Sequence, residues 1–230
     1  IAGVVDPAQL TSVEQCGTGN TTKGSDDVAT CVSEGQTDIG CIAAGIVPES
    51  GVNIDNLGRG SGSLGEVVWP PGAPASAAGD GDHLAVAMVL DGPVPLADPT
   101  LYYQYGWVFD SDGQAGNNYQ ALSSYPADFF IDTDLWVQLL YIPGSGWEMS
   151  VSDIVGNSPV PRFASKAKIV IAGNVLLLLS PDEELLGSAS YPNARYRMSA
   201  FRHDGDYLYG FWNADVHPTV TQPLLSVPQP

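Results

Sequence analysis

The sequence predicts an all-β protein: an antiparallel, jelly-roll-like β-sandwich that follows an extended N-terminal arm containing a disulfide. Two observations predict the sandwich. From residue 80 onward, apolar residues alternate with a period of two in short segments. Gly, Pro and Asp turns separate these segments, and almost no helical pattern lies between them. About eight short strands of this kind are typical of a sandwich.

The predicted strands follow one another at hairpin spacing. They are residues 83–90, 102–109, 129–141, 147–152, 168–172, 175–179, 195–201 and 207–212. The clearest hairpin joins 168–172 to 175–179, because Gly173 and Asn174 suit the positive backbone angles of a two-residue turn. We expect only two helical segments. One is a single turn after Ser180, which would cap it, with Pro181 at its first position. The other spans residues 7–15, with Asp6 as its cap.

Residues 1–79 are rich in Gly, Ser and Thr and have few aromatic side chains, so we expect an arm rather than a self-sufficient core. A Pro- and Ala-rich linker ends the arm, the sandwich spans residues 80–218, and 219–230 form a Pro-rich tail. Ordering such segments alone costs much conformational entropy. The arm is therefore expected to cross to a neighbouring subunit and add Val4-Val5 or Val67-Val68-Trp69 to its sheet edge. The alternative is docking on its own sandwich.

The cysteines also lie in the arm, at Cys16, Cys31 and Cys41. Three cysteines predict one disulfide with one thiol left over, which would be available to bridge subunits. The alternative is three buried, reduced cysteines. Their spacing fits neither a zinc ribbon nor covalent haem attachment.

Charge and hydropathy exclude two classes of function. The formal net charge is −18 with only eight Lys and Arg residues, which excludes ordinary nucleic-acid binding. No apolar run is long enough to span a membrane as a helix. The chain starts at Ile1 without Met, and its apolar start is too short for a signal peptide, so we expect a mature product that is secreted or lies at the cell surface.

An acidic group surrounds the ends of two apolar strands. Five carboxylates lie between residues 110 and 134, at Asp110, Asp112, Asp128, Asp132 and Asp134, without a nearby Lys or Arg in the sequence. Unpaired, they would repel one another, and a hard cation that takes oxygen ligands relieves that repulsion. The sequence therefore predicts a calcium site. The alternative for Asp110 and Asp112 is an Asx-turn.

The order of short motifs resembles that of DOMON-like and carbohydrate-binding family 9-like sandwiches. The resemblance covers about residues 80–218. It is carried by the strand YYQYGWVFDSDG, by Ala127-Asp128-Phe129, by Ser180-Pro181 after the middle hairpin, and by Trp212-Asn213-Ala214-Asp215 before Pro218. It implies a structural calcium held by Asp110, Asp112, Asp128 and Asp215. With Asp132 from the acidic group, these five residues are the predicted metal ligands. Phe129 replaces the Tyr that is usual in the middle motif.

Tryptophans offer an alternative function, since Trp107, Trp136, Trp147 and Trp212 would form a sugar-stacking platform if exposed. Aromatic residues in strands are more often core or cross-strand partners. The resemblance also implies haem binding as a minor alternative, with axial ligands from Met88, Met149, Met198 or His203. Burial in a sheet core is the competing explanation for the methionines.

Catalytic motifs are missing from the sequence. It has neither a GxSxG elbow nor HExxH, and we expect His83, His203 and His217 to be exposed turn residues. The leading prediction is therefore a non-enzymatic, secreted structural subunit that assembles with copies of itself into a filament, sheath or surface layer. The alternative is a carbohydrate-binding module with a polysaccharide partner.

Overall fold

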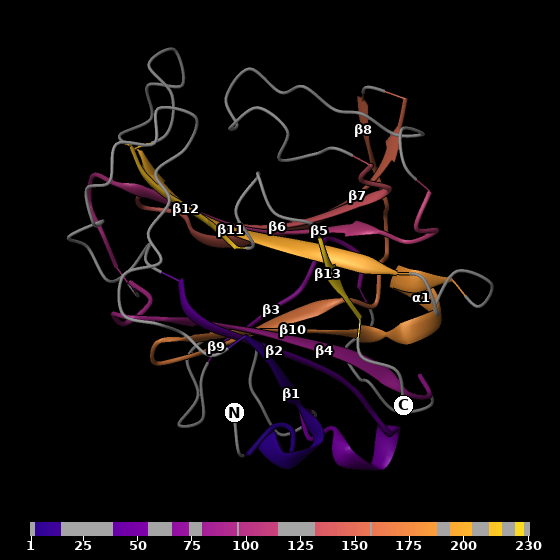
Figure 1. Cartoon of the computed structure of the whole chain (residues 1–230). Coiled ribbons are helices and arrows are strands. Elements are labelled where there is room, and N and C mark those ends of the chain that lie inside the picture. Colours follow the sequence, from indigo (N-terminus) through magenta and orange to yellow (C-terminus); the bar gives the residue numbers. More distant parts are fainter. Residues whose placement is uncertain are drawn as a thin grey trace.

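Two antiparallel sheets packed face to face form the protein (Figure 1). The computed structural model describes residues 3–14, 39–54, 66–73, 80–95, 97–114, 132–156, 158–187, 194–203, 212–217 and 224–227, with the backbone alone for 11–14, 203 and 212–217. Almost all regular structure in these ranges is strand. This arrangement confirms the predicted all-β sandwich.

One sheet has six strands in the described part of the chain. Their order is β1 (Thr11–Glu14), β2 (Ile39–Val47), β4 (His83–Leu90), β10 (Val175–Pro181), β9 (Lys168–Ala172) and β3 (Glu66–Val68). The predicted hairpin joins β9 to β10, and its turn residue Gly173 has a φ of 63°, in the left-handed region that favours glycine. The register is regular from Val175 opposite Ala172 to Leu179 opposite Lys168.

The other sheet has seven strands among the described residues. Their order is β12 (Trp212–His217), β11 (Arg195–His203), β5 (Tyr102–Asp110), β6 (Leu135–Ile142), β7 (Gly146–Val155) and β8 (Ser158–Pro161), while β13 (Leu225–Ser226) also pairs with β11. Two predicted strands have different limits. The start of 129–141 lies outside the described residues, so that β6 is described from Leu135. Of 207–212, only Trp212 is described, and β12 continues from it to His217.

Helices are short throughout the described chain. Helix α1 (Asp182–Leu186) follows Pro181, and no side-chain hydrogen bond caps it, so Ser180 is not the cap that we expected. Asp6 caps a 3-10 helix, Pro7–Gln9, by accepting a hydrogen bond from the Ala8 N–H at 2.9 Å. This helix is shorter than the predicted 7–15 because β1 begins at Thr11 and pairs with β2. A second 3-10 helix spans Glu49–Gly51.

The main core lies between the sheets and follows from the alternation of side chains along each strand. Strand β5 points Tyr105, Trp107 and Phe109 inward, and all three are fully buried. The opposite sheet contributes the inward residues of β4, among them Val86 and Met88. The aromatic side chains of β5 bury large apolar areas, so this strand anchors the interface between the sheets.

Residues from the predicted arm take part in this sandwich. Strand β2 pairs with β4 along its whole length, from Ile39 opposite Leu90 to Val47 opposite His83. Ile42 is fully buried in the main core, and β3 pairs with β9. The predicted boundary at residue 79 thus falls inside one sheet. The prediction of an arm outside the sandwich is corrected accordingly for the described residues.

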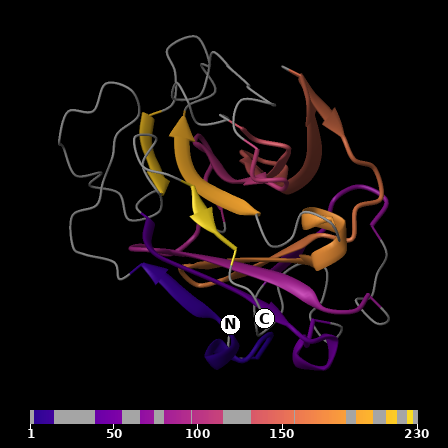
Figure 2. The same cartoon turned by 45° about the vertical axis from the view of Figure 1, so that its right-hand side comes forward.

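A second apolar layer covers the outer face of the six-stranded sheet. Residues 3–10 and 49–54, which we call the N-terminal cover, lie on the side of this sheet away from the other sheet (Figures 1 and 2). Val4, Val5 and Ile54 are buried there against outward residues of β4, β9 and β10. Gly45 permits this close approach, because a Cβ at that position would lie 2.4 Å from the Gln9 carbonyl oxygen.

Among the described residues, the structure has no disulfide. Cys41 lies in β2, is half-buried and carries a free thiol. Cys16 and Cys31 lie outside the described residues.

Replacing Ile42 tests whether β2 belongs to the core. We expect Ile42→Ala to lower the free energy of unfolding by about 2–5 kcal/mol, since the side chain is fully buried and its loss leaves a cavity. Urea unfolding followed by tryptophan fluorescence measures the change. Cys41→Ala, in the same strand at a half-buried position, is the control with a smaller expected effect. An Ile42→Ala variant as stable as the wild type would contradict the placement of β2.

Candidate metal centre and exposed sheet edge

Three carboxylates meet where β5 ends and β6 begins. Asp110 is the last residue of β5, and Asp134 immediately precedes β6, whose Leu135 pairs with Phe109. The backbone fixes Asp134 between two strands: its N–H donates to the Phe109 carbonyl at 2.8 Å, and its carbonyl accepts from the Ile154 N–H at 2.7 Å. Register therefore brings Asp134 to the turn that follows β5.

Asp110, Asp112 and Asp134 form an acidic cluster, which we call the triad. One carboxylate oxygen from each lies within 4.8 Å of the others. Asp110 is fully buried, and the other two are half-buried. Hard cations such as calcium take oxygen ligands of this kind. The geometry is compatible with one divalent ion.

Local hydrogen bonds shape the same turn. Asp134 Oδ2 accepts from the Ser111 N–H at 2.8 Å and from the Ser111 hydroxyl at 2.7 Å. Asp110 Oδ1 accepts from the Gly113 N–H at 2.6 Å, and Asp112 Oδ1 accepts from the Gln114 N–H at 2.8 Å. The Asx-turn alternative is thus also present, because these carboxylates hold the loop whether or not a cation binds.

Arg195 corrects the expectation that no basic residue lies near these acids. It stands opposite Asp110 in the register of β11 with β5. Its Nε donates to Asp110 Oδ2 at 2.9 Å, and a terminal guanidinium nitrogen contacts the same oxygen. The two residues are 85 positions apart in the sequence, so no local sequence pattern predicts that they pair. With Arg195 included, the triad keeps two formal negative charges.

Burial raises the pKa of Asp110 above its ordinary value, and the nearby Asp134 charge adds to this rise. The hydrogen bonds from Arg195 and Gly113 oppose it. A carboxylate whose pKa is raised by folding favours the folded state at acidic pH, and that contribution is lost as the pH rises through the raised pKa. At neutral pH the ionised Asp110 therefore carries a burial cost, which positive charge beside it reduces.

The other predicted ligands are Asp128, Asp132 and Asp215. Asp128 lies outside the described residues. Asp132 is described but is not in the group. Asp215 in β12 stands opposite Ala200, which pairs on its other side with Tyr105, five residues before Asp110. At about 3.3 Å per residue, its backbone is roughly 17 Å along the strand from the cluster. The register thus places the Asp215 backbone away from this cluster, while its side chain lies outside the described part.

The predicted tryptophan platform is not assembled by the described residues. Trp107 is fully buried in the main core. Trp147 is half-buried and packs against the core, with its ring centroid 5.1 Å from that of Tyr141 and 5.9 Å from that of Tyr105. Trp136 is half-buried, and its indole nitrogen is inaccessible to solvent. The side chain of Trp212 is outside the described part.

The candidate haem ligands are mostly core residues. Met88, Met149 and Met198 are all buried in the cluster between the sheets. His83 is fully buried at the start of β4, so the expectation of an exposed turn histidine is wrong for this residue. His203 and His217 end β11 and β12, and their side chains are not described.

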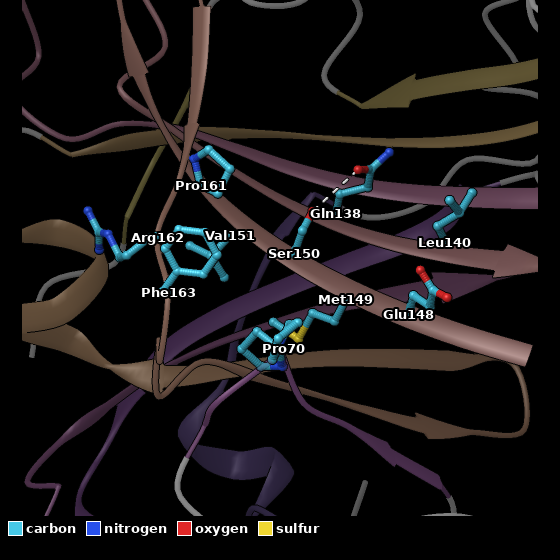
Figure 3. Close-up of a pocket in the computed structure, with 11 residues that line it drawn as sticks. Pro70, Gln138, Leu140, Glu148, Met149, Ser150, Val151, Pro161, Arg162 and Phe163 are labelled. Carbon is cyan, nitrogen blue, oxygen red and sulfur yellow. Dashed lines mark hydrogen bonds between the residues drawn. The ribbon is translucent and has the colours of Figure 1, made fainter.

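A second feature, which the sequence did not predict, is an apolar edge of the seven-stranded sheet. Among the described residues, the exposed large hydrophobic side chains are Val155, Val160 and Phe163, with exposed fractions of 63%, 46% and 82%. They come from the end of β7, from β8 and from the segment that follows β8, and we call this surface the β7–β8 edge. A cleft of about 230 Å³ lies beside this edge, where Pro70, Met149 and Phe163 are among its lining residues (Figure 3). Clustered apolar exposure of this kind marks contact surfaces.

Prolines determine how this edge can make contacts. The Arg162 N–H donates to the Val151 carbonyl at 2.8 Å, and β8 continues this register with Val160 opposite Asp153. Because backbone groups alternate in direction along a strand, Pro159 and Pro161 occupy the positions that face away from β7. Proline has no N–H, so neither residue offers a donor to an added strand. The edge is thus suited to contacts through side chains.

No family model, curated protein or solved structure matches the chain. The resemblance to DOMON-like and carbohydrate-binding family 9-like domains therefore stays a prediction. In the described residues, no helix has the length and apolar composition needed to cross a membrane.

Arg195 gives a direct test of the electrostatics at the triad. Arg195→Gln should lower the free energy of unfolding at neutral pH by roughly 1–3 kcal/mol, because it leaves the buried Asp110 carboxylate without its charged partner. Adding Asp110→Asn should restore much of the loss, since the uncompensated charge is then gone. Urea unfolding of both variants measures this. Equal stability of Arg195→Gln and wild type would contradict the pairing.

Proposed function

We propose that the protein is a non-enzymatic, secreted subunit of an extracellular assembly that contacts its neighbours through the β7–β8 edge. The observation that carries the proposal is the gathering of Val155, Val160 and Phe163 on this one edge. Elsewhere in the described chain, large apolar side chains are buried or half-buried. Exposing a phenylalanine ring to water is unfavourable, and a neighbouring subunit that covers it removes that cost.

The neighbours in this proposal are further copies of the chain, and the contact does not need an exchanged arm. Val4 and Val5 are buried in the N-terminal cover, and Val67 and Val68 belong to β3 of the same sheet. The segments expected to reach a neighbour thus have partners in their own chain. Among the described residues, side-chain packing at the β7–β8 edge is the contact that we propose.

Charge sets the conditions for such an assembly. Each copy carries a formal charge of −18, so copies repel one another unless ions reduce the repulsion. We propose calcium as the structural ion of the sandwich, with Asp110, Asp112 and Asp134 as ligands. The meeting of three carboxylate oxygens within 4.8 Å of one another supports this proposal, since calcium takes oxygen ligands of this kind.

Calcium should raise the melting temperature of the protein. At a free concentration about 100 times the Kd, binding to the folded state alone stabilises it by about 2.7 kcal/mol. Asp134→Asn should abolish most of this gain, whereas Glu183→Gln, at an exposed position in α1, should leave it intact. Differential scanning calorimetry with calcium or with excess EDTA measures the shift. The same melting temperature under both conditions would rule out a structural calcium.

Polar substitution at the edge should release the subunit from the assembly. In the source cells, the wild-type chain should sediment with extracellular material, and a Val160→Ser, Phe163→Ser double variant should appear in the medium as a folded monomer. The control is Ser158→Asn, which changes an exposed polar residue of the same strand. Sedimentation and immunoblotting of the fractions provide the measurement. A wild-type chain that remains monomeric in the medium, or a double variant that sediments like wild type, would refute the proposal.

A further inference from the structure

A buried group of ionisable side chains lies at one end of the six-stranded sheet, outside the sites described above. His83 and Lys168 are both fully buried, although they begin the strands β4 and β9. Asp80 lies beside Lys168, with its side chain only 5% exposed. Charged groups are rarely buried without partners, so the burial of each of these side chains requires an explanation.

The hydrogen bond of His83 shows which ring nitrogen carries a proton in the neutral side chain. Its Nδ1 lies 2.9 Å from the Gly81 carbonyl oxygen, which can only accept, so Nδ1 carries a proton. The other ring nitrogen, Nε2, is buried and has no hydrogen-bond partner among the described residues. A neutral ring leaves Nε2 without a proton, whereas a protonated ring would place an N–H donor there with no acceptor.

The charges around His83 come from three segments. Lys168 is in β9, Asp80 precedes β4, and Glu49 belongs to the N-terminal cover. Asp80 is shared, because its oxygens lie 2.7 Å from Lys166 Nζ and 3.6 Å from Lys168 Nζ. Lys166 also faces Glu184. Protonation of His83 would place a second positive charge near the buried Lys168.

The same residues attach the N-terminal cover to the sheet. Glu49 Oε2 accepts from the Gly81 N–H at 3.2 Å, and the Gly81 carbonyl accepts from His83. Hydrogen bonds therefore link the cover to β4 through Gly81. Beneath the cover lies an apolar surface that includes Ala85, Val170 and Leu177. Water can reach Nε2 of the fully buried His83 only if the segments around it move apart.

We propose that His83 is an acid-sensitive latch, which holds the N-terminal cover on the six-stranded sheet while neutral and releases it when protonated. Burial, and next the charge of Lys168, lower the pKa of His83 from its ordinary value of 6.5, while the Gly81 hydrogen bond, Asp80 and Glu49 act in the opposite direction. We call the form with the N-terminal cover on the sheet closed, and the form with the cover released and the His83 ring solvated open. The open form therefore binds the proton more tightly than the closed form. The closed form is most stable above about pH 6.5 and loses stability as the pH falls below it. This latch acts independently of the β7–β8 edge.

Hydrogen exchange on the full chain tests the latch. Mass spectrometry at about pH 7.5 and about pH 5.5, corrected for intrinsic exchange, should show more opening of residues 3–14 and 39–54 at the lower pH, by up to about tenfold. His83→Gln keeps an N–H donor for Gly81 but cannot be protonated, so its opening should change less than about twofold. His203→Gln, which alters another histidine of the chain, should respond like wild type.

Direct titration of His83 by NMR in the wild-type protein gives a second readout that does not depend on a variant folding. Its pKa should lie below that of an unfolded histidine, and Lys168→Met should raise it. A wild-type pKa at or above about 6.5 would overturn the latch. So would equal pH-dependent opening in His83→Gln and wild type, because carboxylates elsewhere would then cause the effect.

Discussion

The burial of two apolar sheet faces against each other is the constraint on which the rest of this structure depends. Strand β5 is central to it, since Tyr105, Trp107 and Phe109 point into the interface and are fully buried. The pairing of β5 with β6 and β11 then fixes where each neighbouring strand begins and ends. Asp134 and Arg195 meet Asp110 because of this register. The packing of the core, and not the attraction between the charged groups, therefore determines where these three side chains meet.

The sequence predicted the sandwich because strands such as β4 and β5 alternate strongly and end in clear turns. It did not predict β2, because IGCIAAGIV is rich in small residues and is surrounded by turn-like segments that resemble a loop. Those small residues have a structural reason. Gly45 lies against the backbone of Gln9, so a larger residue would separate the N-terminal cover from the sheet.

The candidate site was only partly predictable for a related reason. Asp110 and Asp112 were found because they occupy a turn directly after a strong strand. Choosing Asp134 over Asp132 requires the register of β6, and finding Arg195 requires the pairing of strands far apart in sequence. The burial of His83 depends likewise on β2 and on the N-terminal cover, which the sequence alone placed elsewhere. Local chemistry was thus visible in the sequence, while contacts between distant segments were not.

The proposed contact through the β7–β8 edge is the central claim, and cross-linking within the native assembly tests it most directly. A photoreactive amino acid at Val160, on the exposed edge, should form covalent links to a neighbouring copy when the extracellular material is irradiated. The same probe at Asn174, in the exposed turn between β9 and β10, should form few or none. Identical cross-linking from both positions, or none from residue 160, would contradict the account.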